Sequence, residues 1–206
     1  MSVLVFLGGQ KPSPGLAGEA ARRAGLIIAA DSGYDTCRSN GITPAIVTGD
    51  FDSIASLPHH SGIKVVPCTE QDANDFEKAL RHVPEDAPIL EILGGTGLRS
   101  DHFLTNLLIA ANRPARQAVV FHDDTQSIHR ITADCPFEGQ VARGTTISLI
   151  PFSGCEGVTT SGLHWDLTGA RMGPSHQLGQ SNRSDSETVR IRIEGGTLYL
   201  VINHHL

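Results

Sequence analysis

Short apolar runs alternate with amphipathic segments over the first 122 residues of the chain. The runs have the length of buried strands and cover 3–7, 26–30, 45–48, 63–66, 88–93 and 118–121. Apolar residues at helical spacing lie between them, at 12–24, in a short segment before residue 41, at 74–83 and at 101–111. Gly25 and Gly41 are expected to end the first two helices in a left-handed conformation. The alternation predicts a three-layer α/β domain with a mostly parallel sheet.

The pattern changes after about residue 122, where helical periodicity disappears. Short alternating segments separated by Gly, Pro, Ser and Asn follow, at 127–131, 146–150, 157–160, 189–193 and 198–202. This period-two pattern is typical of an antiparallel β domain, here a small sandwich. The sequence therefore predicts two domains, an α/β domain over 1–122 and a β-sandwich over 123–206.

Composition narrows the class of protein. The net charge is -6 and no run of Lys or Arg occurs, which argues against a nucleic-acid partner. No stretch approaches the length of a membrane span, and the apolar start at 3–7 is expected to be a strand rather than a signal peptide. The four cysteines form no Cys-x-x-Cys pair, which favours reduced thiols in a cytoplasmic protein over a zinc site or a disulfide.

Two carboxylates, Asp50 and Asp52, come directly after the run at 45–48 and Gly49. Side chains two residues apart in an extended segment point to the same side, so the two charges face one small volume and repel. A divalent cation makes such a pair favourable, and Mg²⁺ is commonly held by one or two carboxylates together with phosphates. The alternative is a polar loop in which an Asp caps a short helix from Ser53.

Charged groups recur after successive predicted strands. Those that follow the second to fifth strands are Asp31, Asp50, Asp52, Asp72, Asp75, Arg99 and Asp101. Because ligands of parallel α/β sheets bind beyond the carboxyl ends of the strands, these groups are expected at one edge of the sheet. Such an edge suits an Mg²⁺–phosphate site, and Arg99 offers a fork for phosphate oxygens.

Local motifs near this edge predict further detail. Asn74, with Glu77 three residues on, indicates a capping box, and Ser100 is expected to cap the helix at 101–111. The Gly-Gly-Thr-Gly loop at 94–97 could cradle a phosphate or could be a structural turn. It is neither a P-loop nor a good dinucleotide fingerprint.

Several motifs occur in order and at intervals that match a known family. They are Ala-Asp-Ser-Gly at 30–33, Gly-Asp-Phe-Asp-Ser at 49–53, Asn-Asp-Phe-Glu-Lys-Ala-Leu at 74–80, Arg-Ser-Asp-His at 99–102, Ser-Leu-Ile-Pro at 148–151, Thr-Thr-Ser-Gly-Leu-His-Trp at 159–165 with Leu167, and Ser-Asn at 181–182. Together they resemble the thiamine pyrophosphokinase (thiamine diphosphokinase) family over nearly the whole chain.

This resemblance implies a homodimer that uses ATP and Mg²⁺ to pyrophosphorylate thiamine and releases AMP. The matching catalytic residues are Asp50, Asp52, Asp75, Asp101 and Arg99, and the first three of these are the expected metal ligands. The expected nucleotide-binding residues are Asp31, Ser32, Asp72, Asn74 and His102. The expected thiamine-binding residues, in a pocket completed by the partner subunit, are Trp165, Ser181 and Asn182.

The chain departs from the family pattern at three places: Ser32 replaces a glycine, Asn74 replaces a threonine, and Leu98 stands where glycine often precedes the arginine. The charged groups are intact.

Alternatives stay open at this point. The proton acceptor could be Asp75 or Asp101, Trp165 could belong to the core of the β domain, and the Ser-Asn pair could be a simple turn. An aspartate phosphohydrolase with nucleophilic Asp50 is a rival function. Its motif would sit on the third strand rather than the first, and the sequence does not place the lysine that such enzymes need. A non-catalytic nucleotide- or thiamine-binding module is the other rival.

Overall fold

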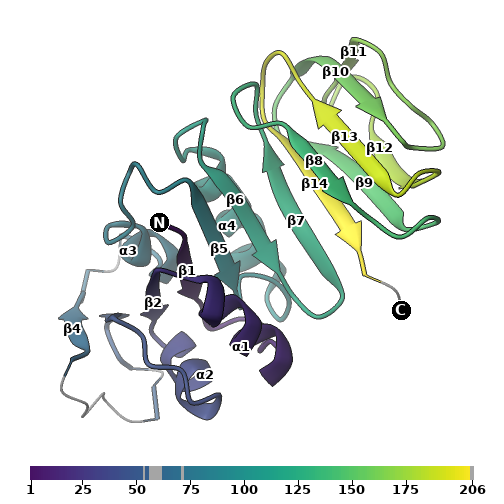
Figure 1. Cartoon of the computed structure of the whole chain (residues 1–206). Helices are drawn as coiled ribbons and strands as arrows, with labels where there is room; N and C mark the ends of the chain where they lie inside the picture. Colours follow the sequence, from purple (N-terminus) through teal and green to yellow (C-terminus); the bar gives the residue numbers. More distant parts are fainter. Residues whose placement is uncertain (53, 56–61, 71, 205–206) are drawn as a thin grey trace. The chain divides into compact units, whose positions relative to one another are not determined.

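A computed structural model describes residues 1–206 apart from 53, 56–61, 71, 205 and 206 (Figure 1). The chain forms two compact units, one of residues 1–112 and 121–124, the other of residues 113–120 and 125–206. Ser53, from which the alternative interpretation would begin a short helix, lies outside the described residues. In the described ranges, no helix combines the length and apolarity needed to cross a membrane.

The first unit is built on five parallel strands in the order β5-β1-β2-β3-β4. Their bounds are β1 Val3–Phe6, β2 Leu26–Ala30, β3 Ile46–Gly49, β4 Lys64–Pro67 and β5 Ile89–Leu93. The strand β6 (Ala118–His122) contributes residues to both units. All four residues of β1 are buried, as expected for a central strand covered on both faces.

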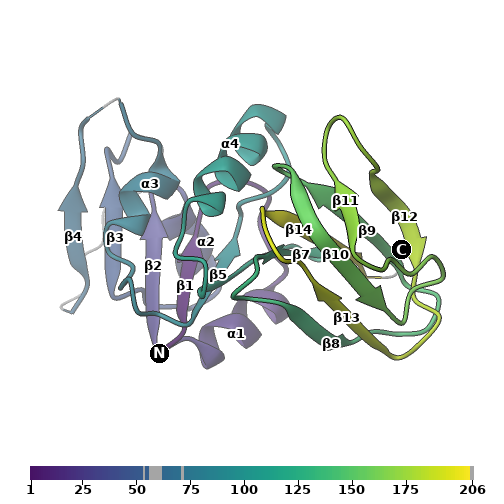
Figure 2. The same ribbon diagram turned by 90° about the horizontal axis from the view of Figure 1, so that it is seen from above.

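Helices cover both faces of this sheet (Figures 1 and 2). They are α1 Pro14–Arg23, α2 Gly33–Ser39, α3 Asp75–Leu80 and α4 Ser100–Ala111. Ala17 and Ala20 of α1 share one core cluster with Tyr34 of α2. On the other face α3 contacts α4, and Phe76 meets Phe121 edge to face with ring centroids 5.9 Å apart. The predicted three-layer α/β class is confirmed.

The helix ends partly follow the predicted signals. Asn74 and Glu77 form the predicted capping box, and Gly41 is left-handed at φ +65°. The helix α3 ends at Leu80 rather than at residue 83. The N-cap of α4 is Arg99, and Ser100 is already helical, so the expected serine cap is wrong.

Gly25 does not have the left-handed conformation expected of it. The C-cap Ala24 is extended and leads directly into β2, so no left-handed turn is needed there. A Cβ at this position would lie 2.3 Å from Cγ of Met1, so the exposed Met1 side chain would have to move.

The second unit is a sandwich of two antiparallel sheets, as predicted, with the strand orders β12-β9-β14-β7 and β11-β10-β13-β8. The strands are β7 Gln126–Ile131, β8 Phe137–Gln140, β9 Thr146–Pro151, β10 Cys155–Ser161, β11 Ala170–Met172, β12 Gly179–Arg183, β13 Thr188–Arg192 and β14 Leu198–Asn203. Ile147 and Leu200 of one sheet pack in one core with Val158 and Ile191 of the other. The strands β8, β11 and β12 were not predicted, because short strands at the sheet ends carry little apolar alternation.

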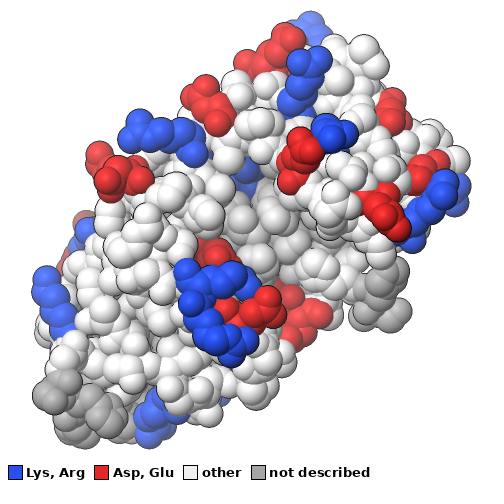
Figure 3. Space-filling model, in the orientation of Figure 1, with Lys and Arg blue, Asp and Glu red and all other residues white. Residues whose placement is uncertain are grey.

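Acidic and basic side chains are interspersed over the face of the molecule shown in Figure 3.

Candidate functional site

Three carboxylates converge where β2 and β3 end. One oxygen each of Asp31, Asp50 and Asp52 lies within 4.8 Å of the other two. The strands β2 and β3 are parallel neighbours, so their carboxyl ends meet at one edge of the sheet. Asp31 is buried, whereas Asp52 is exposed, so the group opens from the protein interior toward solvent.

The backbone around these carboxylates is tightly constrained. The N–H of Asp31 donates to the carbonyl of Thr48 at 2.9 Å, and Asp31 itself has the left-handed φ of +46°. Gly49 has φ +147°, and a Cβ there would lie 3.2 Å from Cβ of Asp31. Phe51 is also left-handed, at φ +64°. Unfavourable backbone conformations of this kind cluster at functional sites.

Asp31 carries an unusual polar atom. Its Oδ1 is buried and has no hydrogen-bond partner among the described residues. A buried carboxylate oxygen without a partner is costly, because it loses its hydration and gains nothing in return. A cation held by Asp31, Asp50 and Asp52 would remove this cost, and three carboxylates are the hard oxygen ligands that Mg²⁺ prefers.

A buried lysine lies next to the cluster. The Nζ atom of Lys78, on α3, is 3.7 Å from Oδ2 of Asp50 and 3.7 Å from Oδ1 of Asp75, and only 4% of its side chain is exposed. The sequence did not place a lysine at this site, and the structure does. The usable signal was the spacing of Asp75 and Lys78, which share one face of a helix at i and i+3.

Asp75 shares Lys78 with Asp50 but is not part of the converged group, which contains Asp31 in its place. Burial raises the pKa of the Asp75 carboxyl, and the charges of Asp31 and Asp50 raise it further, while Lys78 opposes them. Of the three expected metal ligands, Asp50 and Asp52 therefore converge with Asp31, whereas Asp75 does not join this group.

The expected nucleotide-binding residues have varied roles. Oδ1 of Asn74 accepts from the backbone N–H of Glu77 at 2.9 Å, so this oxygen holds the start of α3. Asp72 is exposed. The Ser32 hydroxyl fills a space that exists because residue 8 is glycine, since a Cβ on Gly8 would lie 2.1 Å from Ser32 Oγ. This packing accommodates the departure at Ser32.

Arg99 and Asp101 form an exposed pair at the start of α4. Nε and one terminal nitrogen of Arg99 donate to the two oxygens of Asp101, at 3.1 and 2.5 Å. This pairing, with a smaller contribution from the backbone of the exposed His102, lowers the pKa of the Asp101 carboxyl to about 2. Leu98 is left-handed at φ +54°, which explains why glycine suits that position.

The glycine-rich loop at 94–97 is tied into the fold by its carbonyl groups. Gly94 and Thr96 accept from the N–H groups of Gly9 and Gln10, and Gly95 accepts from Nδ2 of Asn106. These bonds favour a structural turn.

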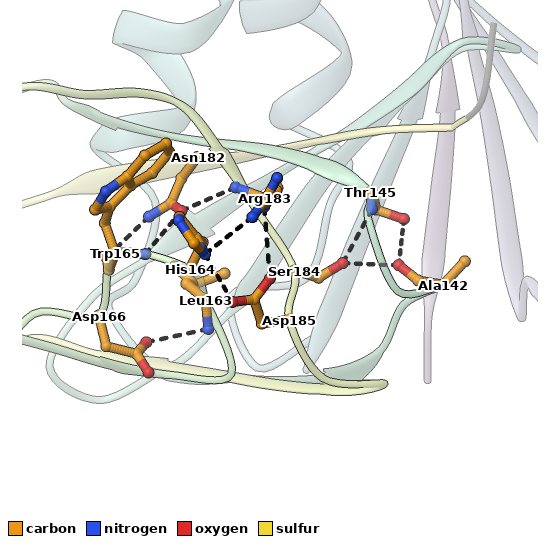
Figure 4. A network of polar contacts seen from close by, with 10 residues as sticks. All are labelled: Ala142, Thr145, Leu163, His164, Trp165, Asp166, Asn182, Arg183, Ser184 and Asp185. Atoms are coloured by element: carbon orange, nitrogen blue, oxygen red, sulfur yellow. Dashed lines mark hydrogen bonds and ion pairs between the residues drawn. The ribbon is translucent and has the colours of Figure 1, made fainter.

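A second candidate region lies in the β unit, around Trp165 (Figure 4). The Trp165 side chain is not in the core, because the residue is 61% exposed. Asn182 is buried, and its amide holds the Trp165 backbone: Oδ1 accepts from N–H at 3.2 Å and Nδ2 donates to the carbonyl at 2.9 Å. Ser181, in β12 rather than in a simple turn, is left-handed at φ +60°, and its N–H donates to Ser148 Oγ.

Comparison with known families decides what these two regions belong to. Residues 18–121 match the sequence model described as thiamin pyrophosphokinase, catalytic domain, and residues 129–198 match the one described as thiamin pyrophosphokinase, vitamin B1 binding domain. The chain belongs to the thiamin pyrophosphokinase family. The catalytic match includes the three carboxylates, Lys78 and Arg99, and the binding match includes Trp165.

Individual proteins named thiamine pyrophosphokinase are also similar to this chain in sequence. The thiamine pyrophosphokinase of Bacillus subtilis is 39% identical over 88 residues, 40% of this chain and 41% of that protein. Thiamine pyrophosphokinase 1 of Oryza sativa subsp. japonica is 27% identical over 174 residues, 77% of this chain and 66% of that protein. The chain thus aligns with less than two thirds of the length of these relatives.

Solved structures share the fold. A crystal structure of thiamine pyrophosphokinase from Bacillus subtilis aligns over 100% of both chains with a TM-score of 0.84 and 23% identity. Thiamin pyrophosphokinase from Candida albicans aligns over 99% of this chain and 90% of its own, with a TM-score of 0.80 and 18% identity.

Proposed function

We propose that this chain transfers the pyrophosphoryl group of ATP to the hydroxyl of thiamine, giving thiamine diphosphate and AMP. The observation that carries the proposal is the convergence of Asp31, Asp50 and Asp52 in a chain of this family, together with a buried Asp31 oxygen that has no hydrogen-bond partner among the described residues. Transfer of phosphoryl-type groups depends mostly on positioning and charge neutralisation, which such a cluster can organise.

Asp31, Asp50 and Asp52 would hold Mg²⁺, which neutralises phosphate charge when bound. Lys78 supports these carboxylates from the interior and balances part of their repulsion. Asp75, which is paired with the same lysine, remains a candidate ligand. Arg99 is proposed to leave Asp101 and bind phosphate oxygens, because its fork fits either partner bidentately.

In the proposed reaction the thiamine oxygen bonds to the β-phosphorus while the bond to the bridging oxygen of AMP breaks. The hydroxyl proton passes to a carboxylate. In the free protein the pairing with Arg99 lowers the pKa of Asp101 to about 2, which makes it a poor acceptor as long as the pair persists. Once Arg99 moves to phosphate, Asp101 and Asp75 are both candidates, and the burial that raises the pKa of Asp75 favours proton uptake there.

The phosphohydrolase rival gains support from Lys78, because a lysine 3.7 Å from Asp50 is what a nucleophilic aspartate would need. Acid quenching after incubation with radiolabelled ATP tests it. A covalent phospho-aspartate lost in Asp50→Asn would favour the rival over pyrophosphoryl transfer.

We propose that Trp165 contacts thiamine, since an indole face suits an aminopyrimidine and a cationic thiazolium. Asn182 would then act mainly by holding Trp165, and Ser181 is exposed and available for hydrogen bonding. The carboxylates belong to one unit and Trp165 to the other. A homodimer that completes each pocket with the partner subunit is proposed on the family resemblance.

Mixing two inactive variants, Trp165→Ala and Asp50→Asn, tests the shared pocket. If pockets are shared, a heterodimer has one site with both defects and one with neither, and activity returns. Failure to recover, with subunit exchange shown by native mass spectrometry, would mean that each chain builds its pocket alone.

Two broader proposals follow. The functional domains are proposed as 1–122 and 123–206, because the two family matches end and begin around this boundary, at 121 and 129. A cytoplasmic location is proposed because Cys37, Cys68, Cys135 and Cys155 are all free thiols.

The deciding experiment incubates the chain with ATP, Mg²⁺ and thiamine and separates the products by chromatography. Equal amounts of AMP and thiamine diphosphate are expected, and neither should form without thiamine. Release of ADP and phosphate independent of thiamine would point to a hydrolase. Binding of thiamine and ATP without any product would point to the non-catalytic module.

A further inference from the structure

The exposure of Trp165 raises the question of what holds its indole ring. An aromatic side chain that is 61% exposed has little packing to fix its rotamer. Immobilising such a side chain on binding weakens affinity, and a ring already held in place avoids that loss.

The Trp165 loop consists of residues 162–169, between β10 and β11. Hydrogen bonds hold its backbone on both sides of Trp165. Asn182 bonds both the N–H and the carbonyl of Trp165, and the N–H of His164 donates to the carbonyl of Arg183 at 2.9 Å. The carboxylate of Asp166 accepts from the N–H of Leu163 at 3.1 Å and from the N–H of Gly162 at 3.2 Å. These bonds fix where the Trp165 side chain starts, but they do not orient its ring.

The ring itself meets a second ring. The His164 imidazole lies edge to face with the indole, with centroids 4.5 Å apart and an interplanar angle of 82°. Nδ1 of His164 is 2.8 Å from Oδ2 of Asp185 and 3.1 Å from a terminal nitrogen of Arg183 (Figure 4). With a proton, Nδ1 donates to Asp185; without one, it accepts from Arg183. The same nitrogen is therefore held in either tautomer.

We propose that His164, anchored by Asp185 and Arg183, is a positioning residue that orients the indole ring of Trp165 for stacking on thiamine. The proposal rests on the proposed function for its ligand. The orientation of the ring is a property of the free protein and can be tested without any substrate.

The chain has a single tryptophan, so its intrinsic fluorescence reports on Trp165 alone. His164→Ala and Asp185→Asn should lower the fluorescence anisotropy and raise the acrylamide quenching constant about twofold in the free protein. His164→Phe keeps a ring at the indole but loses the anchor, and it should fall between wild type and His164→Ala. His176→Ala removes another exposed histidine of the same unit and serves as the control.

Thiamine binding is then measured by quenching of the same fluorescence. His164→Ala should raise the Kd and KM for thiamine about threefold to tenfold, the range expected for an unfixed side chain, and leave kcat and the KM for ATP within about twofold. Unchanged anisotropy and acrylamide quenching in a folded His164→Ala would overturn the proposal. If wild type neither binds thiamine nor turns over, the proposed function fails, and the anisotropy comparison still decides the positioning role.

Discussion

The carboxylate cluster and the Trp165 loop present their functional groups in different ways. The cluster places Asp31, Asp50 and Asp52 close together, and a buried oxygen of Asp31 has no hydrogen bond to any residue that the structure describes. In the Trp165 loop, the Asn182 amide forms hydrogen bonds with both the N–H and the carbonyl of Trp165, and the indole ring is exposed. The carboxylate cluster is suited to bind a cation, and the exposed indole ring is suited to stack on a flat ligand. The activity of the cluster should therefore depend on a divalent cation, and ligand binding at the loop should depend on the position of the ring.

The largest effect is expected from removing one charge of the cluster. Asp52→Asn should lower turnover about 10²–10³-fold, because it removes one of the carboxylates proposed to hold the Mg²⁺ that neutralises phosphate charge. The apo protein should keep or raise its Tm, since Asp52 is exposed and its removal relieves repulsion. Turnover assays with Mg²⁺ and thermal unfolding without it measure both effects. Asp134→Asn, an exposed acid elsewhere, is the control.

Asp50→Asn should lower turnover about as much as Asp52→Asn, but its effect on the stability of the apo protein should differ. It removes one of two carboxylates that face the buried Lys78, so the apo protein should lose about 1–3 kcal/mol. From the sequence alone, only the repulsion between Asp50 and Asp52 was expected, and that repulsion does not predict a loss of stability in Asp50→Asn. Near-wild-type turnover in both variants would remove the cluster from the reaction.

Lys78→Met tests whether the lysine balances the negative charge of the carboxylate cluster when no cation is bound. Without the ammonium group, the carboxylates repel one another more strongly in the apo protein, and Mg²⁺ should restore more stability than it does in wild type. The gain in Tm on adding Mg²⁺ should exceed the wild-type gain by on the order of 2–4 °C. Differential scanning fluorimetry with and without Mg²⁺ measures it, and an equal gain would contradict a charge-balancing role for Lys78.

Asn182→Ala tests the loop, and its effect should fall on thiamine alone. Losing both bonds to the Trp165 backbone should weaken the apparent affinity for thiamine by about 1–2 kcal/mol, roughly tenfold in KM. The KM for ATP should stay nearly constant, since the carboxylates lie in the other unit. Steady-state kinetics with each substrate varied in turn separate the two, and equal changes in both KM values would argue that the regions are not independent.

The sequence predicted the first region better than the second, for a physical reason. Sheet topology brings the ends of adjacent strands together, so the convergence of Asp31, Asp50 and Asp52 could be expected from their place after the apolar runs. Lys78 was missed because lysine on a helix is usually solvated, and its burial depends on tertiary packing.

The Trp165 loop shows what sequence cannot supply. A lone tryptophan is more often buried, whereas this one is exposed and its backbone is held by Asn182, which lies in an edge strand that was not predicted. Those contacts join residues 17 positions apart with no periodic signal between them. The family resemblance, rather than the pattern, indicated the residue's role.

The smallest effect is expected at Glu91, a buried acid of the first unit that contrasts with Asp31. Its carboxylate has partners: Arg23 donates at 2.9 Å and His122 lies at 3.4 Å, and these lower the pKa of Glu91, with His122 the larger cause. A lowered pKa in the folded state gives stability that is present above the unfolded pKa and is lost as pH falls through the folded one. Glu91→Gln should therefore destabilise the protein by about 1 kcal/mol at neutral pH and by almost nothing in acid below both pKa values. Urea unfolding at the two pH values measures this difference, with Glu19→Gln, the exposed partner of Arg23, as the control. A loss that persists unchanged in acid would mean that Glu91 acts by packing, and the contrast between a satisfied and an unsatisfied buried acid would not hold.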